Sequence, residues 1–155
     1  MIGPAFTVKC VIGDARAVAH AVDQARPGDV LVIDAGGTDL TTPWGSMSAT
    51  AAKLRGLAGC VTNGGVRDFD ELVEIGFPVF AAGIGIRGNV KLHPGCIGIP
   101  VSVGGVTVRP GKKWFEMQLA LWLCQWKEPR KYVQKVRNSM PRKPILCNAF
   151  VQESV

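Results

Sequence analysis

The residues best equipped for chemistry lie in one stretch, Thr62–Glu71, with the sequence TNGGVRDFDE. Arg67 carries a planar guanidinium that suits a carboxylate, and the neighbouring Asp68 offers the hard oxygen that a divalent cation prefers. The two glycines before them allow a tight turn that brings backbone N–H groups close to a ligand. The stretch therefore predicts a site for a 2-oxo acid and its metal ion. The simpler interpretation is that Asp68 is only a helix N-cap and Arg67 only a solvated charge.

A second candidate element is the turn formed by Gly45, Ser46 and Met47, which opens an Ala-rich helical pattern. The first N–H groups of a helix lack intrahelical partners, and the helix dipole is positive at that end. Such an end accepts an anion without a side-chain charge. The turn therefore predicts a carboxylate-binding element, and the alternative is that Ser46 serves only as an N-cap.

Both elements must be positioned by strands and helices, which we predict from apolar runs and helical spacing. The predicted strands are Ala5–Ile12, Val30–Asp34, Cys60–Val61 and Pro78–Ile84; the predicted helices are Asp14–Ala25, Ser46–Leu57 and one that follows Asp68; and Ile99–Val103 pairs with Val106–Val108 in a hairpin closed at Gly104 and Gly105. This alternation predicts an α/β sandwich. Ligands gather at the carboxyl ends of strands in such folds, where the loops Gly36–Met47 and Asn63–Asp68 both fall.

Two of these elements have a clear burial pattern. The first helix is expected to begin at Asp14 as its N-cap and to bury one apolar face, made of Ala17, Val18, Ala21 and Val22. Val30–Asp34 is a continuous apolar run, which is typical of a strand buried on both faces. In the helix after Asp68, the apolar positions are Phe69, Leu72, Val73 and Ile75.

The net charge of +6 is unevenly distributed along the 155 residues. Residues 1–111 carry nine Lys or Arg and nine Asp or Glu, whereas residues 112–155 carry nine basic and three acidic residues. Three of the four tryptophans also follow residue 111. We therefore interpret residues 1–111 as one α/β domain and residues 112–155 as a basic, Trp-rich, atypical tail. No run of about 18 apolar residues occurs, so no membrane span is predicted.

The five cysteines include no C-x-x-C pair. We interpret them as reduced, mostly buried thiols of a cytoplasmic protein, because the start of the chain also lacks a secretory signal. Neither His20 nor His93 is a convincing partner for a catalytic thiol.

The motifs, in this order and spacing, resemble the RraA-like family, which includes the 4-hydroxy-4-methyl-2-oxoglutarate aldolases and the regulators of ribonuclease E activity. The matching stretches are GPAFTV (Gly3–Val8), PGDVLVID (Pro27–Asp34), WGSMSATAA (Trp44–Ala52), GLAGCVTNGGVRDFDE (Gly56–Glu71), FPVFA (Phe77–Ala81) and PVSVGGVTVRPG (Pro100–Gly111). The resemblance implies a single-domain β/β/α swivelling-domain-like sandwich. It also implies a homotrimer, or a hexamer built as a dimer of trimers.

The resemblance further implies an activity. The aldolase members of the family depend on a divalent cation, Mg²⁺ or Mn²⁺. They cleave 4-hydroxy-2-oxo acids to pyruvate and a second 2-oxo acid, and they decarboxylate oxaloacetate. A cation and a guanidinium placed where negative charge develops lower the barrier to such C–C cleavage.

The implied roles fall on matching positions of this sequence. Asp68 would ligate the cation among waters, and Arg67 would bind the keto oxygen of the substrate and stabilise its enolate. Glu71 would support the site from behind these two residues. The pyruvyl carboxylate would be held by the backbone N–H groups of Gly45, Ser46, Met47 and Ser48.

The sequence departs from the family pattern at three places. An acid usually follows the glycine of the W-G motif, and here that residue is Ser46. The chain begins almost at Gly3, without the helical segment that usually comes first. After Gly111 the usual D-x-D-G-V-V-V-V-P strand is replaced by KKWFEMQLALWLCQW. One hypothesis is a one-base frameshift in the coding sequence, and the alternative is a basic helix over Lys112–Lys127 followed by a flexible end.

Two hypotheses compete with the enzyme. A non-catalytic RraA-type protein that binds and inhibits a ribonuclease E-like partner is favoured by Ser46, whereas the intact pattern of Arg67, Asp68 and Glu71 favours the aldolase. A damaged gene product without activity is the third hypothesis. A nucleic-acid role for the basic tail is the least favoured.

Overall fold

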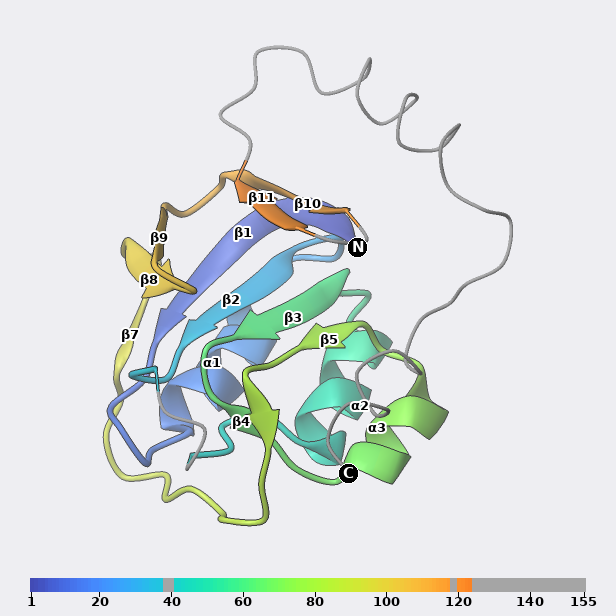
Figure 1. The fold of residues 1–155 in the computed structure, drawn as a ribbon, viewed down its shortest axis with the longest axis vertical. Coiled ribbons are helices and arrows are strands. Elements are labelled where there is room, and N and C mark those ends of the chain that lie inside the picture. The colour runs from blue at the N-terminus through green and yellow to red at the C-terminus, as the bar shows by residue number, and fades with distance from the viewer. Residues whose placement is uncertain (38–40, 118–119, 124–155) are drawn as a thin grey trace. The chain divides into compact units, whose positions relative to one another are not determined.

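A seven-stranded sheet lies at the centre of the structure, a computed structural model that describes residues 1–37, 41–117 and 120–123 (Figure 1). Its parallel strands, in spatial order, are β1 (Ile2–Lys9), β2 (Val30–Asp34), β3 (Gly59–Thr62) and β5 (Val79–Phe80). On its other side, β1 pairs with two antiparallel strands: β10 (Lys113–Met117) at its start and β7 (Cys96–Ile97) at its end. A further antiparallel strand, β11 (Ala120–Leu123), pairs with β10. Because β1, β2 and β3 are parallel, their carboxyl ends meet at one edge of the sheet.

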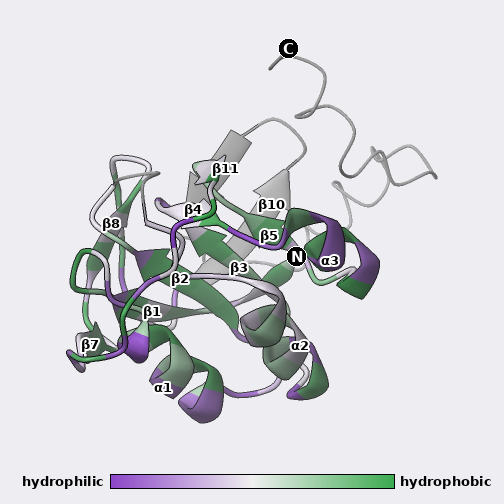
Figure 2. Ribbon diagram, turned by 90° about the horizontal axis from the view of Figure 1, so that it is seen from below, coloured by the Kyte–Doolittle hydropathy of each residue, from purple (hydrophilic) through white to green (hydrophobic). Residues whose placement is uncertain are grey.

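One face of the sheet is covered by helices (Figure 2). They are α1 (Arg16–Gln24), α2 (Ser46–Leu54) and α3 (Phe69–Ile75). The buried face of α1 is the predicted one, formed by Ala17, Val18, Ala21 and Val22. It packs in the same cluster as Leu31, Ile33 and Cys60 from the helix-facing side of the sheet.

The opposite face of the sheet is covered by a hairpin of β8 (Val101–Val103) and β9 (Val106–Val108). Gly104 and Gly105 close it with φ of 59° and 77°, the left-handed conformation that two-residue hairpin turns require. Three hairpin valines pack on Ala5, Val30, Val32 and Val61 of the sheet. The layers are therefore hairpin, sheet and helices, which confirms the predicted α/β sandwich and its β/β/α order.

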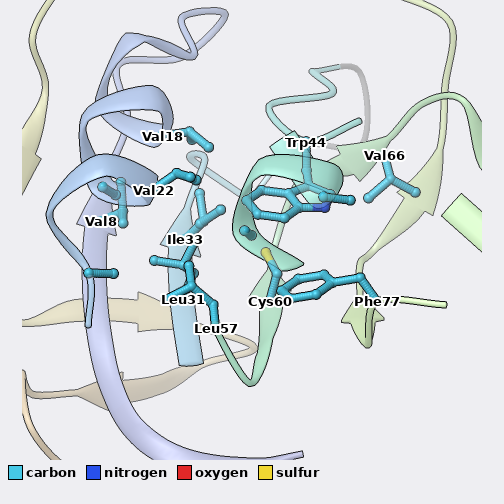
Figure 3. Packing of buried hydrophobic residues seen from close by; sticks show 14 of the residues in the cluster. Val8, Val18, Val22, Leu31, Ile33, Trp44, Leu57, Cys60, Val66 and Phe77 are labelled. Carbon is cyan, nitrogen blue, oxygen red and sulfur yellow. The ribbon is translucent and has the colours of Figure 1, made fainter. Parts of the chain in front are cut away.

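The centre of the helix-side core is Trp44, which is fully buried (Figure 3). Its indole stacks on Phe77 with ring centroids 5.9 Å apart. Among the described residues the indole Nε1 has no hydrogen-bond partner. Trp44 lies two residues before Ser46, the first residue of α2, so its burial anchors the chain just before that helix.

The thiols that the structure describes agree with the prediction of reduced cysteines. Cys10 and Cys60 are free and buried, whereas Cys96 is free and exposed. Burial is the largest cause that raises the pKa of Cys10 to about 12 and the pKa of Cys60 well above its usual range. Neither buried thiol is therefore suited to nucleophilic chemistry.

Helix α2 is shorter than predicted, because it ends at Leu54 and not at Leu57. Gly56 follows it with φ of 74°, a conformation that glycine adopts without steric cost. The N–H groups of Gly56 and Leu57 donate to the carbonyls of Lys53 and Ala52, at 3.0 Å each. These two bonds close the helix in a Schellman motif.

The prediction of one strand over Pro78–Ile84 was wrong, because the chain leaves the main sheet after β5. A second short strand, β6 (Gly83–Ile84), pairs instead with β4 (Gly65–Val66) in a separate parallel ribbon. The intervening Ala82 donates its N–H to the Gly64 carbonyl at 3.0 Å. The chain therefore bends toward the loop that carries the predicted site.

The helix predicted as one alternative for Lys112–Lys127 is also wrong where the structure describes this segment. Lys113–Met117 and Ala120–Leu123 are the strands β10 and β11, and β10 pairs with the start of β1. Residues 118–119 and 124–155 lie outside the described residues, so the frameshift hypothesis and the flexible end remain predictions. No helix in the described part of the chain is long and apolar enough to cross a membrane.

Candidate functional site

Arg67 and Asp68 lie at the junction between β4 and α3, next to the beginning of α2. Asp68 precedes α3 with φ of 57° and ψ of 46°, and it is the only non-glycine residue with positive φ in the part of the chain that the structure describes. A left-handed aspartate costs on the order of 1–3 kcal/mol, and such conformations cluster at functional sites. The side chain of Asp68 makes no capping hydrogen bond to α3, so the N-cap interpretation does not explain it.

The Asp68 carboxylate contacts the first residue of α2 instead. The amide N–H and the hydroxyl of Ser46 both donate to Oδ2 of Asp68, at 3.2 Å each. Oδ1 of Asp68 has no partner among the described residues. The aspartate is thus anchored through one oxygen, and the other oxygen is open to a ligand.

Gly45 makes this contact possible because it has no side chain. A Cβ at Gly45 would lie 2.7 Å from Oδ2 of Asp68 and 2.9 Å and 3.0 Å from Cγ and Nε of Arg67. Its own backbone is extended, with φ of −160°, so the requirement for glycine here is steric and not conformational. The two functional side chains therefore pack directly on the backbone of the α2 turn.

The Arg67 guanidinium lies beside the Asp68 carboxylate, with Nε 3.6 Å from Oδ2. The side chains of Arg67 and Asp68 are 44% and 35% exposed. The remaining guanidinium nitrogens of Arg67 have no acceptor among the described residues. The Asp68 carboxylate therefore compensates only part of the Arg67 charge, and both side chains are accessible. The free N–H donors of Arg67 can bind an incoming anion.

The predicted carboxylate-binding turn exists, but one of its amides is already used. The Ser46 N–H is directed to Asp68, whereas the N–H groups of Met47 and Ser48 have no acceptor in the described structure. These two amides stand in the first turn of α2, where the helix dipole is positive. The turn can therefore bind a carboxylate through two amides beside the Arg67 fork.

Glu71 is placed in the first turn of α3, one turn beyond Asp68. It is exposed, and it makes no hydrogen bond or ion pair to another described residue. Its supporting role therefore stays a prediction.

The backbone around the site is held by contacts that the sequence did not reveal. The Trp44 carbonyl accepts the Arg67 N–H at 3.1 Å, and the Thr41 carbonyl accepts the Gly65 N–H at 2.8 Å. The segment before α2 therefore runs alongside β4, and this places Gly45 against Arg67. These contacts join residues more than twenty positions apart, so no local pattern could have indicated them.

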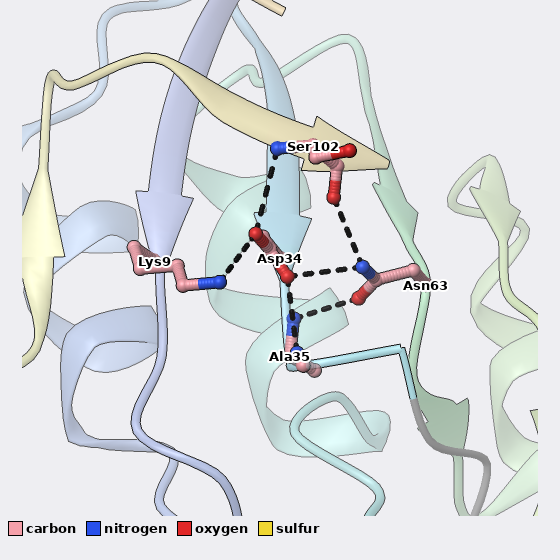
Figure 4. Close-up of polar contacts among 6 residues, drawn as sticks. Lys9, Asp34, Ala35, Asn63 and Ser102 are labelled. Atoms are coloured by element: carbon pink, nitrogen blue, oxygen red, sulfur yellow. Dashed lines mark hydrogen bonds and ion pairs between the residues drawn. The ribbon is translucent and has the colours of Figure 1, made fainter. Parts of the chain in front are cut away.

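A second polar cluster, centred on Asp34, lies at the carboxyl end of β2 (Figure 4). Asp34 accepts hydrogen bonds from Lys9 at 2.6 Å, from Asn63 at 3.0 Å and from the Ser102 N–H at 3.4 Å. Burial raises the pKa of this carboxyl, but the bonds from Lys9 and Asn63 outweigh burial and lower it. Because the Asp34 carboxylate and the Asn63 amide are fully engaged, this cluster ties together β1, β2, β8 and the loop that follows β3, and it serves the fold.

The fit of a divalent cation rests on Asp68 alone. No group of three or more His, Cys, Asp or Glu side chains in the described part of the chain could enclose a metal ion. Mg²⁺ is commonly bound by one or two carboxylates and keeps several waters. The open Oδ1 of Asp68 fits such a weakly held, largely hydrated ion, and it does not fit a closed protein cage.

Comparisons with known proteins agree with this arrangement. The family model RraA-like, described as Aldolase/RraA, matches residues 1–114. A curated protein from Halalkalibacterium halodurans, named "Putative 4-hydroxy-4-methyl-2-oxoglutarate aldolase", is 41% identical over 111 residues, which are 72% of this chain and 53% of that protein. The chain therefore spans about half the length of this relative.

Two solved structures resemble the fold. The RNA-processing inhibitor RraA from Thermus thermophilis is 32% identical with a TM-score of 0.69, over 73% of this chain and 68% of that one. Streptomyces coelicolor RraAS2, titled an unusual member of the RNase ES inhibitor RraA protein family, is 32% identical with a TM-score of 0.66, over 74% of this chain and 59% of that one. With the family match over residues 1–114, these similarities show that the chain belongs to the RraA-like family.

Proposed function

We propose that this chain is a divalent-metal-dependent pyruvate aldolase that cleaves 4-hydroxy-4-methyl-2-oxoglutarate-type substrates and also decarboxylates oxaloacetate. The observation that carries the proposal is the joint placement of three groups. They are the half-exposed Arg67 guanidinium, the open oxygen of Asp68 and the free amides of the α2 turn. A 2-oxo acid presents a carboxylate and an adjacent keto oxygen, which match these donors.

In this proposal the amides of Met47 and Ser48 bind the pyruvyl carboxylate of the substrate. The Arg67 guanidinium donates to the neighbouring keto oxygen. In the cleavage, the 4-hydroxyl of the substrate loses its proton to water and becomes the carbonyl of the second 2-oxo acid. The electron pair of the broken C–C bond passes into the pyruvyl unit, and negative charge develops on that keto oxygen. The enolate then takes up a proton from water to give pyruvate. A fixed guanidinium at the keto oxygen favours the transition state over the ground state.

Asp68 has two tasks. Its Oδ2 orders the α2 turn through Ser46, and its Oδ1 would hold Mg²⁺ or Mn²⁺. Such an ion supplies Lewis-acid stabilisation of the charge on the keto oxygen. Ser46 replaces the acid that the family resemblance implies, so the metal site has one carboxylate fewer. We therefore expect weak metal binding, which saturates only at millimolar metal concentrations.

The second candidate function is non-catalytic inhibition of a ribonuclease E-like partner. It is supported by the titles of the Thermus and Streptomyces relatives and by the missing acid at Ser46. We also propose that the chain assembles as a homotrimer or hexamer, as the family resemblance implies.

The test is pyruvate release from oxaloacetate, measured by coupling to lactate dehydrogenase with and without Mg²⁺ or Mn²⁺. We expect metal-dependent turnover that EDTA abolishes and that Asp68→Asn lowers by about 10²-fold or more. Asp70→Asn is the matched control, because it removes an exposed carboxylate from the first turn of α3. A rate no higher than that of metal ion without protein, or full activity in Asp68→Asn, would overturn the proposal and favour the inhibitor.

A further inference from the structure

The segment 85–93 crosses the carboxyl-end edge of the sheet, and we call it the strap. It follows β6, and the Gly85 N–H donates to the Val66 carbonyl at 2.9 Å. Apart from a bridge between Val90 and Asp14, the strap contains no helix or strand. Its course therefore depends on side-chain and loop contacts at its two ends.

The far end of the strap is fastened to Asp14, which is 2% exposed. Oδ2 of Asp14 accepts the N–H groups of Leu92 and His93, at 2.7 Å each, and contacts Nδ1 of His93 at 3.2 Å. The N–H of Val90 donates to the Gly13 carbonyl at 3.0 Å. The prediction of Asp14 as the N-cap of the first helix was wrong, because the N-cap is Ala15. Asp14 lies one residue earlier and accepts the Arg16 N–H at 2.8 Å.

The near end of the strap is fastened to Thr42, which is 3% exposed. The Thr42 hydroxyl donates to the Arg87 carbonyl, and its N–H donates to Oδ1 of Asn89 at 3.2 Å. One buried threonine thus holds both neighbours of Gly88. Thr42 lies three residues before Gly45, so the strap and the α2 turn share this support.

Gly88 lies between Arg87 and Asn89, the two residues that Thr42 holds, and it is close to the tip of Arg67. A Cβ at Gly88 would be 3.4 Å from Nη1 of Arg67. Gly45 lies beside Cγ and Nε of the same side chain, as described above. Arg67 therefore has a glycine near the middle of its side chain and another beyond its tip.

We propose that Thr42 is a positioning residue that orients the Arg67 guanidinium through the strap. An arginine that is nearly half exposed has many rotamers, and a mobile guanidinium stabilises developing charge poorly. By holding Arg87 and Asn89, Thr42 fixes Gly88 at a distance where only one further methyl group would fit before Nη1 of Arg67. This limits the rotamers open to the guanidinium before substrate binds. The effect of Thr42 on catalysis rests on the function proposed above. Its effect on the orientation of the guanidinium is independent of that function.

The test compares Thr42→Val with Thr42→Ser. Valine has the shape of threonine and lacks the hydroxyl, whereas serine keeps the donor to the Arg87 carbonyl. The first readout is the Arg67 Nε–Hε resonance in ¹⁵N NMR spectra, assigned by its loss in Arg67→Lys. The second is the separate effect on kcat and KM for oxaloacetate.

We expect Thr42→Val to shift and broaden the Arg67 resonance and to lower kcat/KM about tenfold. In Thr42→Ser the Arg67 resonance should stay close to that of the unmodified protein, and kcat/KM should stay within about twofold of its value. A merely space-filling role for Thr42 would not produce this difference between serine and valine. If Thr42→Val does not fold, Asn89→Ala is measured instead, because it removes the acceptor of the Thr42 N–H and frees one of the two neighbours of Gly88 that Thr42 holds. The Arg67 resonance should then shift, by less than a loss of both bonds would cause. An unchanged Arg67 resonance in the folded variant, or equal effects of valine and serine, would overturn the inference. If the unmodified protein lacks turnover, the proposed function fails, and the resonance alone decides the positioning role.

Discussion

Gly45→Ala tests most sharply how the site is assembled. The backbone of Gly45 is extended, so alanine has no conformational cost there, and the whole effect comes from the added methyl group. That methyl would lie 2.7 Å from Oδ2 of Asp68, and ordinary contact begins near 3.4 Å. The carboxylate must therefore move by about 0.7 Å, and a shift away from the α2 turn lengthens and weakens its two 3.2 Å bonds to Ser46.

A displacement of this size at reacting groups costs on the order of 10²-fold in rate, or about 2.7 kcal/mol in activation free energy. The free energy of unfolding should change little, because both displaced side chains are partly exposed. Replacing glycine by alanine can even add about 0.4–1 kcal/mol through the unfolded state. We therefore expect kcat/KM for oxaloacetate to fall while the thermal melting curve stays close to that of the unmodified protein.

The comparison variant is Gly88→Ala, close to the tip of the same arginine. Its methyl would lie 3.4 Å from Nη1 of Arg67, which is ordinary contact, so a much smaller loss is expected. If Gly45→Ala retains full kcat/KM with an unchanged melting curve, the contact between the α2 turn and the functional pair does not matter. The geometric argument would then be refuted.

Two further predictions concern stability. Trp44→Ala should lower the free energy of unfolding by about 3–5 kcal/mol in urea titrations. Trp44→Phe should lower it by much less, because phenylalanine keeps an aromatic ring against Phe77 and removes a buried N–H that has no acceptor among the described residues. Equal losses in the two variants would contradict the packing argument. Burial raises the pKa of Asp14, but hydrogen bonds from Arg16, His93 and Leu92 outweigh it and lower the pKa to about 2. A carboxyl whose pKa is lowered in the folded state stabilises fully above its unfolded value and loses that contribution as the pH falls toward 2. The free energy of unfolding should therefore decline between about pH 4 and pH 2. Asp14→Asn should make this decline less steep. The same pH profile in the variant and the unmodified protein would exclude the role given to these hydrogen bonds.

Local sequence patterns predicted the elements whose burial repeats regularly. The spacing of Ala17, Val18, Ala21 and Val22 identified the buried face of α1, and the apolar run Val30–Asp34 identified a strand buried on both faces. Paired glycines identified the hairpin turn, because only a left-handed backbone closes it in two residues. The order of strands and helices then located both loops at one edge of the sheet.

The pairings that complete the site could not be predicted, because their partners are distant in sequence. β4 and β6 contain two residues each, which is too short for any periodicity, and they exist only because they pair with each other. Thr42 and Asn89 are 47 positions apart, and Asp14 and Leu92 are 78 apart. Ser46 was recognised as a substitution for an acid, but its two bonds to Asp68 follow only from the approach of α2 to the β4–α3 junction.

The most direct test of the central claim is Mn²⁺ binding, followed by electron paramagnetic resonance with and without pyruvate. If Asp68 holds the cation beside a keto acid bound by Arg67, pyruvate should tighten Mn²⁺ binding in the unmodified protein, since coupling between two ligands is reciprocal. Asp68→Asn should weaken Mn²⁺ binding about tenfold or more and abolish the effect of pyruvate. Equal Mn²⁺ affinity in the two proteins, or no response to pyruvate in either, would contradict the account.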